Sequence, residues 1–207
     1  MTLNAYGYSG IIPVSNEFLG SSVVAAEDMV SRALGQRLAK GYGPRLATGT
    51  GTNQPTGLTV GASDGITTAA TGSITADELI KTFYAVPAEY RAQYAMRWVM
   101  SDSTHEALRK LKDSDNNYLL GNIADMGADR LLGAPITIDN NMPELASGNV
   151  PIVFGAIEDL FVVRATALRV DSSTDAAFTS NQTVFRAVWD LDSKVLDPAG
   201  IVKVTAA

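Results

Sequence analysis

The 207-residue sequence contains no cysteine and only one histidine, His105. Without cysteine the chain forms no disulfide bond, builds no thiolate zinc site and has no thiol nucleophile. No apolar run approaches the roughly 18 residues that a membrane-spanning helix needs, and the N-terminus lacks the basic region and apolar core of a signal peptide. We therefore expect a protein that is made in the cytoplasm and does not enter a membrane.

Basic residues are also few. The chain has 16 Lys and Arg against 22 Asp and Glu, a formal net charge of −6. Nonspecific affinity for nucleic acid comes from neutralising phosphates with Lys and Arg. If the protein meets DNA, we therefore expect it to contain the DNA rather than to bind it. The content of 46% hydrophobic residues is typical of a folded protein, and the length suits one large domain or two small interlocked ones.

A long amphipathic helix is predicted from Val23 to Lys40. Apolar residues recur there with the 3.6-residue period of a helix, and polar residues occupy the other side. Ser21 or Ser22 can cap its first turn. Gly41 can take the left-handed conformation that closes a helix. We expect a rod of roughly 27 Å.

Two further helices are predicted in the middle of the chain. One begins at a capping box, Thr75 with Glu78, and reaches a boundary at Pro87, after which residues 88–93 can continue it beyond a kink. The other opens near Ser101 or Ser103. The short segment "MRWVMS" between them is mostly apolar and suits a buried strand.

The second half of the chain reads mainly as β-structure. Residues 113–133 are loop-like, and the last fifty residues alternate between large apolar and polar side chains, as half-exposed strands do. Helices followed by a long β-rich end, without a βαβ rhythm, indicate the α+β class. The predicted strands are "APITID", "VPIVFG", "FVVRATALRV" and "QTVFRAVWDLDSKVLDP".

The glycine-rich stretch "GTGTNQPTGL", residues 49–58, invites a test for phosphate binding. A dinucleotide-binding fingerprint requires glycine where Gln54 stands. Such a fingerprint also follows a strand, whereas this stretch follows a predicted helix. A Walker motif requires lysine after its last glycine, but Gly57 is followed by Leu58. We therefore predict a structural turn that uses the backbone freedom of glycine and the fixed φ of proline. Its residues are Gly49, Gly51, Pro55 and Gly57.

Residues 113–117 match the start of a calcium loop. Asp113, Asp115 and Asn117 have the spacing of its first three ligands. Tyr118 stands where glycine makes the sharp turn, and Ala124 stands where a glutamate completes the ligand shell. The pattern therefore favours a solvated turn at the end of a helix, and we expect no metal site and no cofactor.

The polar residues near His105 do not predict a catalytic triad. Asp102, Ser103 and His105 are close neighbours on a starting helix, so their side chains point in different directions. Ser103 is better explained as a helix cap with Glu106.

Two pairs of acids are the remaining candidates for acid–base chemistry. Glu158 is next to Asp159, and Asp190 and Asp192 lie two apart on a predicted strand, so that they share one face. A charged edge strand has the same pattern. We predict no catalytic residue, and a small hydrolase that uses carboxylates stays as an alternative.

Several stretches, taken in order, resemble the major capsid protein of tailed bacteriophages, the HK97-type family. The resemblance covers nearly the whole chain and rests on the ordered set rather than on one motif. Residues 23–40 are similar to the spine helix of the family. The matching stretches are "IIPVSNEFLGSS", "GTGTNQPTGL", "RWVMSDSTHEALRKLKDSDNNYLL", "VFGAIEDLFVVR" and "VFRAVWDLDSKVLDPAGIVKV".

The resemblance implies an HK97-like capsid fold with a long spine helix, a peripheral β-rich domain and an axial α/β domain. Residues 1–60 and 155–207 would form the peripheral domain, and residues 61–154 the axial one. It also implies a non-enzymatic subunit of a phage or prophage head that assembles into hexamers and pentamers and encloses double-stranded DNA without specific binding. An encapsulin-like protein compartment is the alternative within the same fold.

The resemblance is incomplete at the N-terminus. Family members usually carry an N-terminal arm and an extended loop, but here only about ten residues precede the stretch 11–20. We expect that this chain lacks those elements and by itself is a monomer or small oligomer. We also expect exposed apolar and charged surfaces, because the natural partners of a shell subunit are copies of itself.

Overall fold

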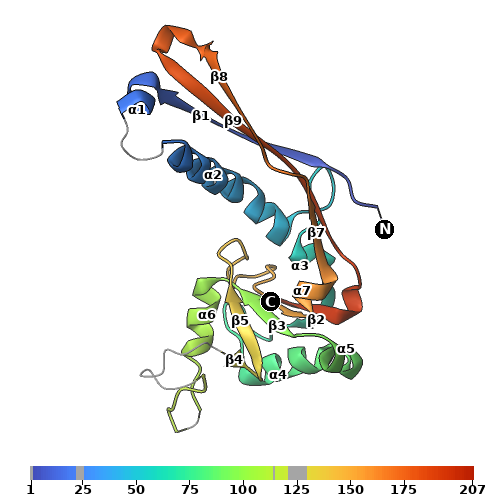
Figure 1. Cartoon of the computed structure of the whole chain (residues 1–207). Helices are drawn as coiled ribbons and strands as arrows, with labels where there is room; N and C mark the ends of the chain where they lie inside the picture. Colours follow the sequence, from blue (N-terminus) through green and yellow to red (C-terminus); the bar gives the residue numbers. More distant parts are fainter. Residues whose placement is uncertain (1, 22–25, 114, 121–129) are drawn as a thin grey trace.

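The computed structural model describes residues 2–21, 26–113, 115–120 and 130–207 and shows an elongated molecule with two β-sheets (Figure 1). We call residues 2–48 and 161–196 the upper lobe and residues 61–160 and 197–207 the lower lobe. The N-terminus lies beside the junction of the two lobes, and the C-terminus lies in the lower lobe. This arrangement confirms the α+β class.

The sheet of the upper lobe has four strands around a central one. Strand β1 is antiparallel to β9, and their register runs from Tyr6 opposite Leu191 to Ser15 opposite Gln182. On the other side of β9, β7 and β8 each pair antiparallel with a different part of the strand. The strands are β1 (Tyr6–Ser15), β7 (Phe161–Ala165), β8 (Arg169–Ala177) and β9 (Gln182–Val195).

Helix α2 (Ala26–Thr48) covers one face of this sheet. Val30, Leu34 and Leu38 form a buried cluster with Ala187 of β9. Their spacing of four residues places them on one side of the helix, as the sequence predicted. A short helix, α1 (Asn16–Ser21), precedes it, and the predicted helix start at residues 22–25 lies outside the described residues.

The predicted end of the long helix at Gly41 is wrong. The helix continues through Gly41 to Thr48 and includes Pro44. The extra turns bury side chains: the Tyr42 ring contacts that of Trp189 at a centroid distance of 4.8 Å, and Ala47 is 3% exposed. Packing against the sheet therefore overrides the local tendency of glycine to end a helix.

The lower lobe contains a six-stranded mixed sheet in the order β2-β10-β6-β3-β5-β4. The β10–β2 and β3–β5 pairs are parallel, and the other pairs are antiparallel. The strands predicted near residues 97, 134 and 152 are confirmed. The sheet consists of β2 (Ser63–Thr67), β3 (Arg97–Met100), β4 (Arg130–Leu131), β5 (Ala134–Ile138), β6 (Ile152–Gly155) and β10 (Ile201–Thr205).

Two of the predicted helices flank this sheet, and each begins close to the predicted residues. The capping box is present: the Thr75 hydroxyl accepts from the Glu78 N–H, and the Glu78 carboxylate accepts from the Thr75 N–H. The predicted cap at Ser103 is wrong, because Ser101 Oγ accepts the Thr104 N–H at 3.3 Å. The helices of the lower lobe are α4 (Ala76–Ala85), α5 (Ala88–Gln93), α6 (Asp102–Arg109) and the single turn α7 (Ile157–Leu160); α3 (Leu58–Gly61) leads into this lobe.

The two lobes share a hydrophobic core. Leu58 of α3 packs in one cluster with Val153 of β6, Val195 of β9 and Ile201 of β10. Strand pairing places β10 in the lower sheet, so residues 155–207 contribute strands to both sheets. The predicted domain boundaries at residues 60/61 and 154/155 stay a prediction.

The buried carboxylate of Glu78 predicts a pH-dependent contribution to stability. It accepts hydrogen bonds from the Ala69 N–H at 2.6 Å and the Thr75 N–H at 2.7 Å. Burial raises the pKa of Glu78, but these bonds and that of the Thr75 hydroxyl outweigh burial, so the net pKa is lowered. The stabilisation is therefore complete above the unfolded-state pKa and is lost as the pH falls through the folded-state pKa.

Glu78→Gln should lower the free energy of unfolding by about 1–2 kcal/mol at pH 7, with a smaller difference near pH 3. Urea denaturation at both pH values measures this. Glu89→Gln, an exposed glutamate on α5, is the matched control and should change little at either pH. An equal loss for Glu78→Gln at both pH values would contradict the role of the charge.

Candidate functional surfaces

The glycine-rich segment 49–58 forms a closed loop between the end of α2 and α3. The Gly49 N–H continues the helical pattern by donating to Arg45 O at 2.8 Å, and the Gly57 N–H returns to Gly49 O at 2.7 Å. Thr56 joins the loop to β9, because its N–H donates to Ser193 O at 3.2 Å and its carbonyl accepts the Ser193 hydroxyl at 2.8 Å. The loop therefore connects the end of helix α2 to strand β9.

The glycines of this loop allow backbone segments to approach closely. A Cβ atom on Gly57 would lie 2.7 Å from Ala47 O and would overlap the Gly49 nitrogen. A Cβ on Gly49 would overlap the carbonyl oxygens of Arg45 and Pro55. Gly51 has a φ of +78°. Since the N–H groups of all three glycines donate within this region, they do not form a phosphate cradle. Their role in folding and assembly stays a prediction.

The acid pair on β9 lies in the centre of a sheet, so the alternative interpretation as a charged edge strand is wrong. β9 pairs with β1 on one side and with β7 and β8 on the other. Asp192 is 6% exposed and accepts the N–H of Asn4 at 2.7 Å and of Ser193 at 2.8 Å. Its carboxylate therefore holds the N-terminal segment against the sheet. No pattern in the sequence predicts this contact, which joins residues 188 positions apart.

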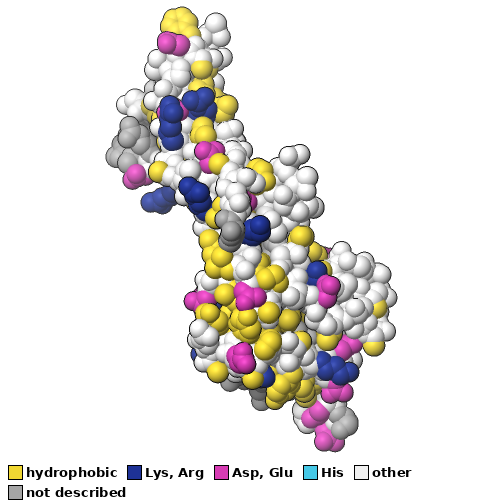
Figure 2. All heavy atoms as spheres, turned by 90° about the vertical axis from the view of Figure 1, so that its right-hand side faces the viewer, with side chains coloured by type: hydrophobic (Ala, Val, Ile, Leu, Met, Phe, Trp, Pro, Cys, Tyr) yellow, Lys and Arg dark blue, Asp and Glu magenta, His cyan; other side chains and the backbone are white. Residues whose placement is uncertain are grey.

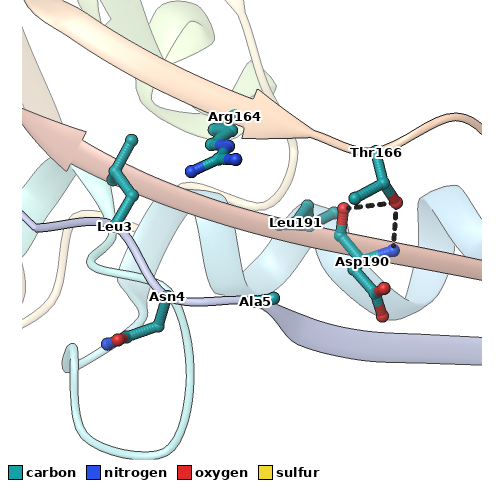
Figure 3. Close-up of a pocket in the computed structure, with 7 residues that line it drawn as sticks. All are labelled: Leu3, Asn4, Ala5, Arg164, Thr166, Asp190 and Leu191. Atoms are coloured by element: carbon teal, nitrogen blue, oxygen red, sulfur yellow. Dashed lines mark hydrogen bonds between the residues drawn. The ribbon is translucent and has the colours of Figure 1, made fainter.

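Asp190 lines a hollow of about 160 Å³ with Arg164 and the N-terminal segment (Figure 3). Thr166 spans the main chain of Asp190: its hydroxyl accepts the Asp190 N–H at 3.2 Å and donates to the carbonyl at 3.3 Å. In Figure 3 the Asp190 carboxylate points away from the Arg164 guanidinium. The arrangement places one acid, without a second acid or a histidine, in the hollow, which does not suit a hydrolase.

The other residues considered for chemistry are separate from one another. Glu158 on α7 forms an ion pair with Arg97 of β3, and Asp159 is exposed. Ser103 Oγ lies 3.1 Å from Ser101 Oγ, at the start of α6. Within the described residues, no group of three or more His, Asp or Glu side chains could hold a metal ion. Nor does any described helix have the length and hydropathy to cross a membrane.

Asp113 closes a turn in the segment that follows α6. Its Oδ1 accepts the N–H groups of Asp115 at 2.9 Å and of Asn117 at 2.8 Å. These bonds, first the one from Asn117, hold the pKa of Asp113 below its usual value. Ala124, the last position of the calcium template, lies outside the described residues.

A contact that sequence reasoning missed joins "LDPAGIV" to α5. The Tyr90 hydroxyl donates to Asp197, which also accepts the Ala199 N–H at 3.0 Å. This hydrogen bond raises the pKa of Tyr90 and lowers that of Asp197. A Cβ on Gly200 would lie 2.9 Å from Cδ1 of the Tyr90 ring. The Asp-Pro-x-Gly pattern was the available signal, since it is typical of a turn capped by aspartate.

Large hydrophobic side chains are exposed on both lobes, as we expected for a subunit that has partners. Phe178, between β8 and β9, is 80% exposed, and Tyr84 on α4 is 66% exposed. Figure 2 shows a broad hydrophobic area on the lower lobe, with Asp and Glu side chains among and beside it. Exposed hydrophobic patches of this kind mark sites of protein contact.

The phage capsid family matches residues 1–206 of the chain. The chain belongs to the phage capsid family. It is thus a structural, non-enzymatic component of a virion capsid with the HK97-type fold, a shell subunit of a phage or gene-transfer-agent head. The family assignment agrees with the absence of a catalytic arrangement around Asp190.

Solved structures with this capsid fold cover the whole chain. The capsid of an empty GTA particle, computed with C5 symmetry, is 26% identical and has a TM-score of 0.87; the match covers 100% of this chain and 75% of that one. The capsid of the native GTA particle has a TM-score of 0.88 at the same identity, covering 100% and 74%. Microbacterium phage Oxtober96 matches in fold at 17% identity with a TM-score of 0.74, covering 99% and 73%. No curated protein matches significantly.

Proposed function

We propose that this capsid subunit assembles into pentamers and hexamers, which close into a shell around double-stranded DNA. The likeness to a GTA capsid with C5 symmetry carries this proposal, because it extends over the whole chain at a TM-score of 0.87. A fivefold particle axis is surrounded by five copies of one subunit, and flat regions of a closed shell require sixfold groups of the same subunit. We therefore propose that the same subunit fold forms both the pentamers and the hexamers.

The charge of the chain supports a container rather than a DNA-binding protein. A net charge of −6 gives little net attraction for phosphates. A lining that bound DNA tightly would oppose both packaging and release. We therefore propose that the enclosed DNA is held without specific contacts.

We also propose that the upper lobe corresponds to the peripheral domain and the lower lobe to the axial one. The support is the division into a four-stranded and a six-stranded sheet, with the amendment that β10 accompanies the lower sheet. The loop of Gly49, Gly51, Pro55 and Gly57 would then be the structural link between the spine helix and the axial domain.

The contents of the particle test this proposal. Particles that contain this protein should be purified from the cells that make it, treated with DNase and opened. We expect double-stranded DNA that the shell has protected from the nuclease. Particles filled with a protein cargo instead of DNA would contradict the proposal and indicate a protein compartment of the same fold.

A further inference from the structure

We propose that the exposed side of helix α2 lies against the enclosed DNA. The shell wall then has α2 on its inner surface and the opposite face of the upper-lobe sheet on its outer surface. This inference rests on the proposed function and identifies the surface of the subunit that meets the DNA. The exposed side of α2 consists of Arg32, Gly35, Gln36, Ala39, Lys40 and Gly43.

The helical period separates this side from the one that packs on the sheet. Leu34 and Leu38 are buried in the cluster with Ala187 of β9. Side chains advance by about 100° per residue along a helix, so the exposed side points away from the sheet. Arg32 and Lys40 are exposed there. In the described part of the chain α2 packs against β1, β9 and α3, and no described element of the upper lobe covers its exposed side (Figure 1).

The charge of α2 differs from that of the whole chain. Residues 29–48 contain four basic residues and no acid, although the net charge of the chain is −6. The two acids of the helix, at positions 27 and 28, lie in its first turn. The basic residues are Arg32, Arg37, Lys40 and Arg45.

The strands of the upper sheet have no comparable excess of positive charge. Strand β1 has no charged residue, and β7, β8 and β9 together have four basic and four acidic residues. Some of these charges neutralise one another directly, because Asp171 accepts from Arg169 Nε and from Arg186 Nη2, each at 2.9 Å. The positive charge of the upper lobe is therefore concentrated on α2.

Two cations on the exposed side of α2 are available to a partner. In the described part of the chain, neither Arg32 nor Lys40 forms a hydrogen bond or an ion pair. Arg37 differs from them, because one of its guanidinium N–H groups donates to Ile11 O at 2.7 Å and holds the side chain beside β1. Arg32 and Lys40 can therefore contact phosphates without breaking a contact within the subunit.

The exposed side suits the backbone of a DNA duplex. Arg32 and Lys40 are eight residues apart, which is about 12 Å along the helix axis. A duplex carries one negative charge per about 1.7 Å of its axis, so phosphates can reach both cations in any register. Contacts with phosphates do not read the base sequence. They agree with the proposal that the enclosed DNA is held without specific contacts.

A second copy of the chain fits this surface less well. Contacts between subunits bury apolar side chains at their centre, but the exposed side of α2 has two cations, one amide and three small residues. Met29, one turn before Arg32, is 60% exposed, and a single apolar side chain makes a poor interface core. The exposed Ile11 and Phe178 belong to β1 and to the turn between β8 and β9.

Electron microscopy of DNA-filled particles determines which surface of the wall α2 forms. The particles are purified from the cells that make them, and the structure is fitted into the density of the wall. We expect α2 on the inner surface, with the nearest layer of DNA density beside Arg32 and Lys40. Finding α2 on the outer surface, or separated from the DNA by another copy of the chain, would overturn the inference.

Removing the two cations tests the role of charge. Particles with Arg32→Gln combined with Lys40→Gln are opened and emptied, and the walls are tested for binding of a short fluorescent duplex at several salt concentrations. Binding should weaken at least tenfold. The slope of log K against log [salt] should fall by about 1.8 for each subunit that the duplex contacts.

Arg164→Gln combined with Lys194→Gln is the matched control. It also removes one arginine and one lysine, both of which are exposed on strands of the sheet. We expect these walls to bind the duplex as the unchanged walls do. Equal weakening by the two double variants, or no weakening by either, would contradict the assignment to α2.

Formaldehyde cross-linking of unchanged, filled particles needs no variant. Formaldehyde joins lysine amines to nearby DNA bases, and mass spectrometry of the digested protein locates the modified lysines. We expect DNA on Lys40 and none on Lys194, which is exposed on β9. DNA on Lys194 without DNA on Lys40 would reverse the proposed orientation of the wall.

The outcomes separate this inference from the proposed function. DNA-filled particles in which α2 faces outward would overturn the inference and leave the proposed function intact. Particles filled with a protein cargo instead of DNA would overturn both.

Discussion

Gly57→Val is expected to lower the free energy of unfolding by about 3 kcal/mol, with a fall in melting temperature of about 6–12 °C. A Cβ at this position lies 2.7 Å from Ala47 O and from Thr48 N and overlaps the Gly49 nitrogen. These are backbone atoms, so they cannot rotate away as a side chain can. The end of α2 and the loop that joins it to β9 must both shift. Calorimetry on the purified variant measures the effect.

Gly35→Ala is the control for this substitution. Gly35 lies inside α2, and a Cβ there meets no atom within 4 Å. We expect this change to raise stability by about 0.5–1 kcal/mol, because alanine favours the helix. If Gly57→Val melted at the temperature of the unchanged protein, the loop would not need close backbone contact and its structural role would be lost.

Trp98→Ala should have a still larger effect, about 3–5 kcal/mol. Trp98 is fully buried in β3, and its ring lies 4.2 Å from that of Phe154 between centroids. Its Nε1–H donates to Leu131 O at 2.9 Å and so joins β3 to the far edge of the sheet. Alanine leaves a cavity and removes the hydrogen bond to Leu131 O. Denaturant unfolding, followed by circular dichroism, measures the loss.

Trp98→Phe separates the two contributions. Phenylalanine keeps most of the packing but donates no hydrogen bond, so we expect a loss of about 1–3 kcal/mol. Tyr84→Ala removes an aromatic ring that is 66% exposed on the same lobe and should change stability by less than about 0.5 kcal/mol. A comparable loss for Tyr84→Ala and Trp98→Ala would contradict the assignment of the core to β3 and β6.

Local patterns predicted the elements that depend on local chemistry. The capping box at Thr75 is recognised from residues only three positions apart, and the buried side of α2 is recognised from the helical period of its apolar residues. Strand β1 was missed because its stability comes from β9, about 170 residues later. The end of α2 was placed too early for the same kind of reason, since Tyr42 packs on Trp189 from the C-terminal part of the chain.

The candidate residues show the same division. Counting positions was enough to remove phosphate binding from Gly49–Leu58, because that motif is defined by spacing. The place of Asp192 in the sheet could not be read from its neighbours, since a central and an edge strand have similar alternation. Its partner Asn4 lies at the other end of the sequence. The contact of Tyr90 with Asp197 is likewise long-range.

Electron microscopy of the assembled protein tests the central claim most directly. The protein should be expressed with whatever its gene encodes before residue 1, and the product imaged and classified by symmetry. The proposed function predicts closed shells with fivefold vertices and sixfold groups of this subunit between them. Particles without these symmetries, or a protein that remains monomeric at high concentration, would contradict it.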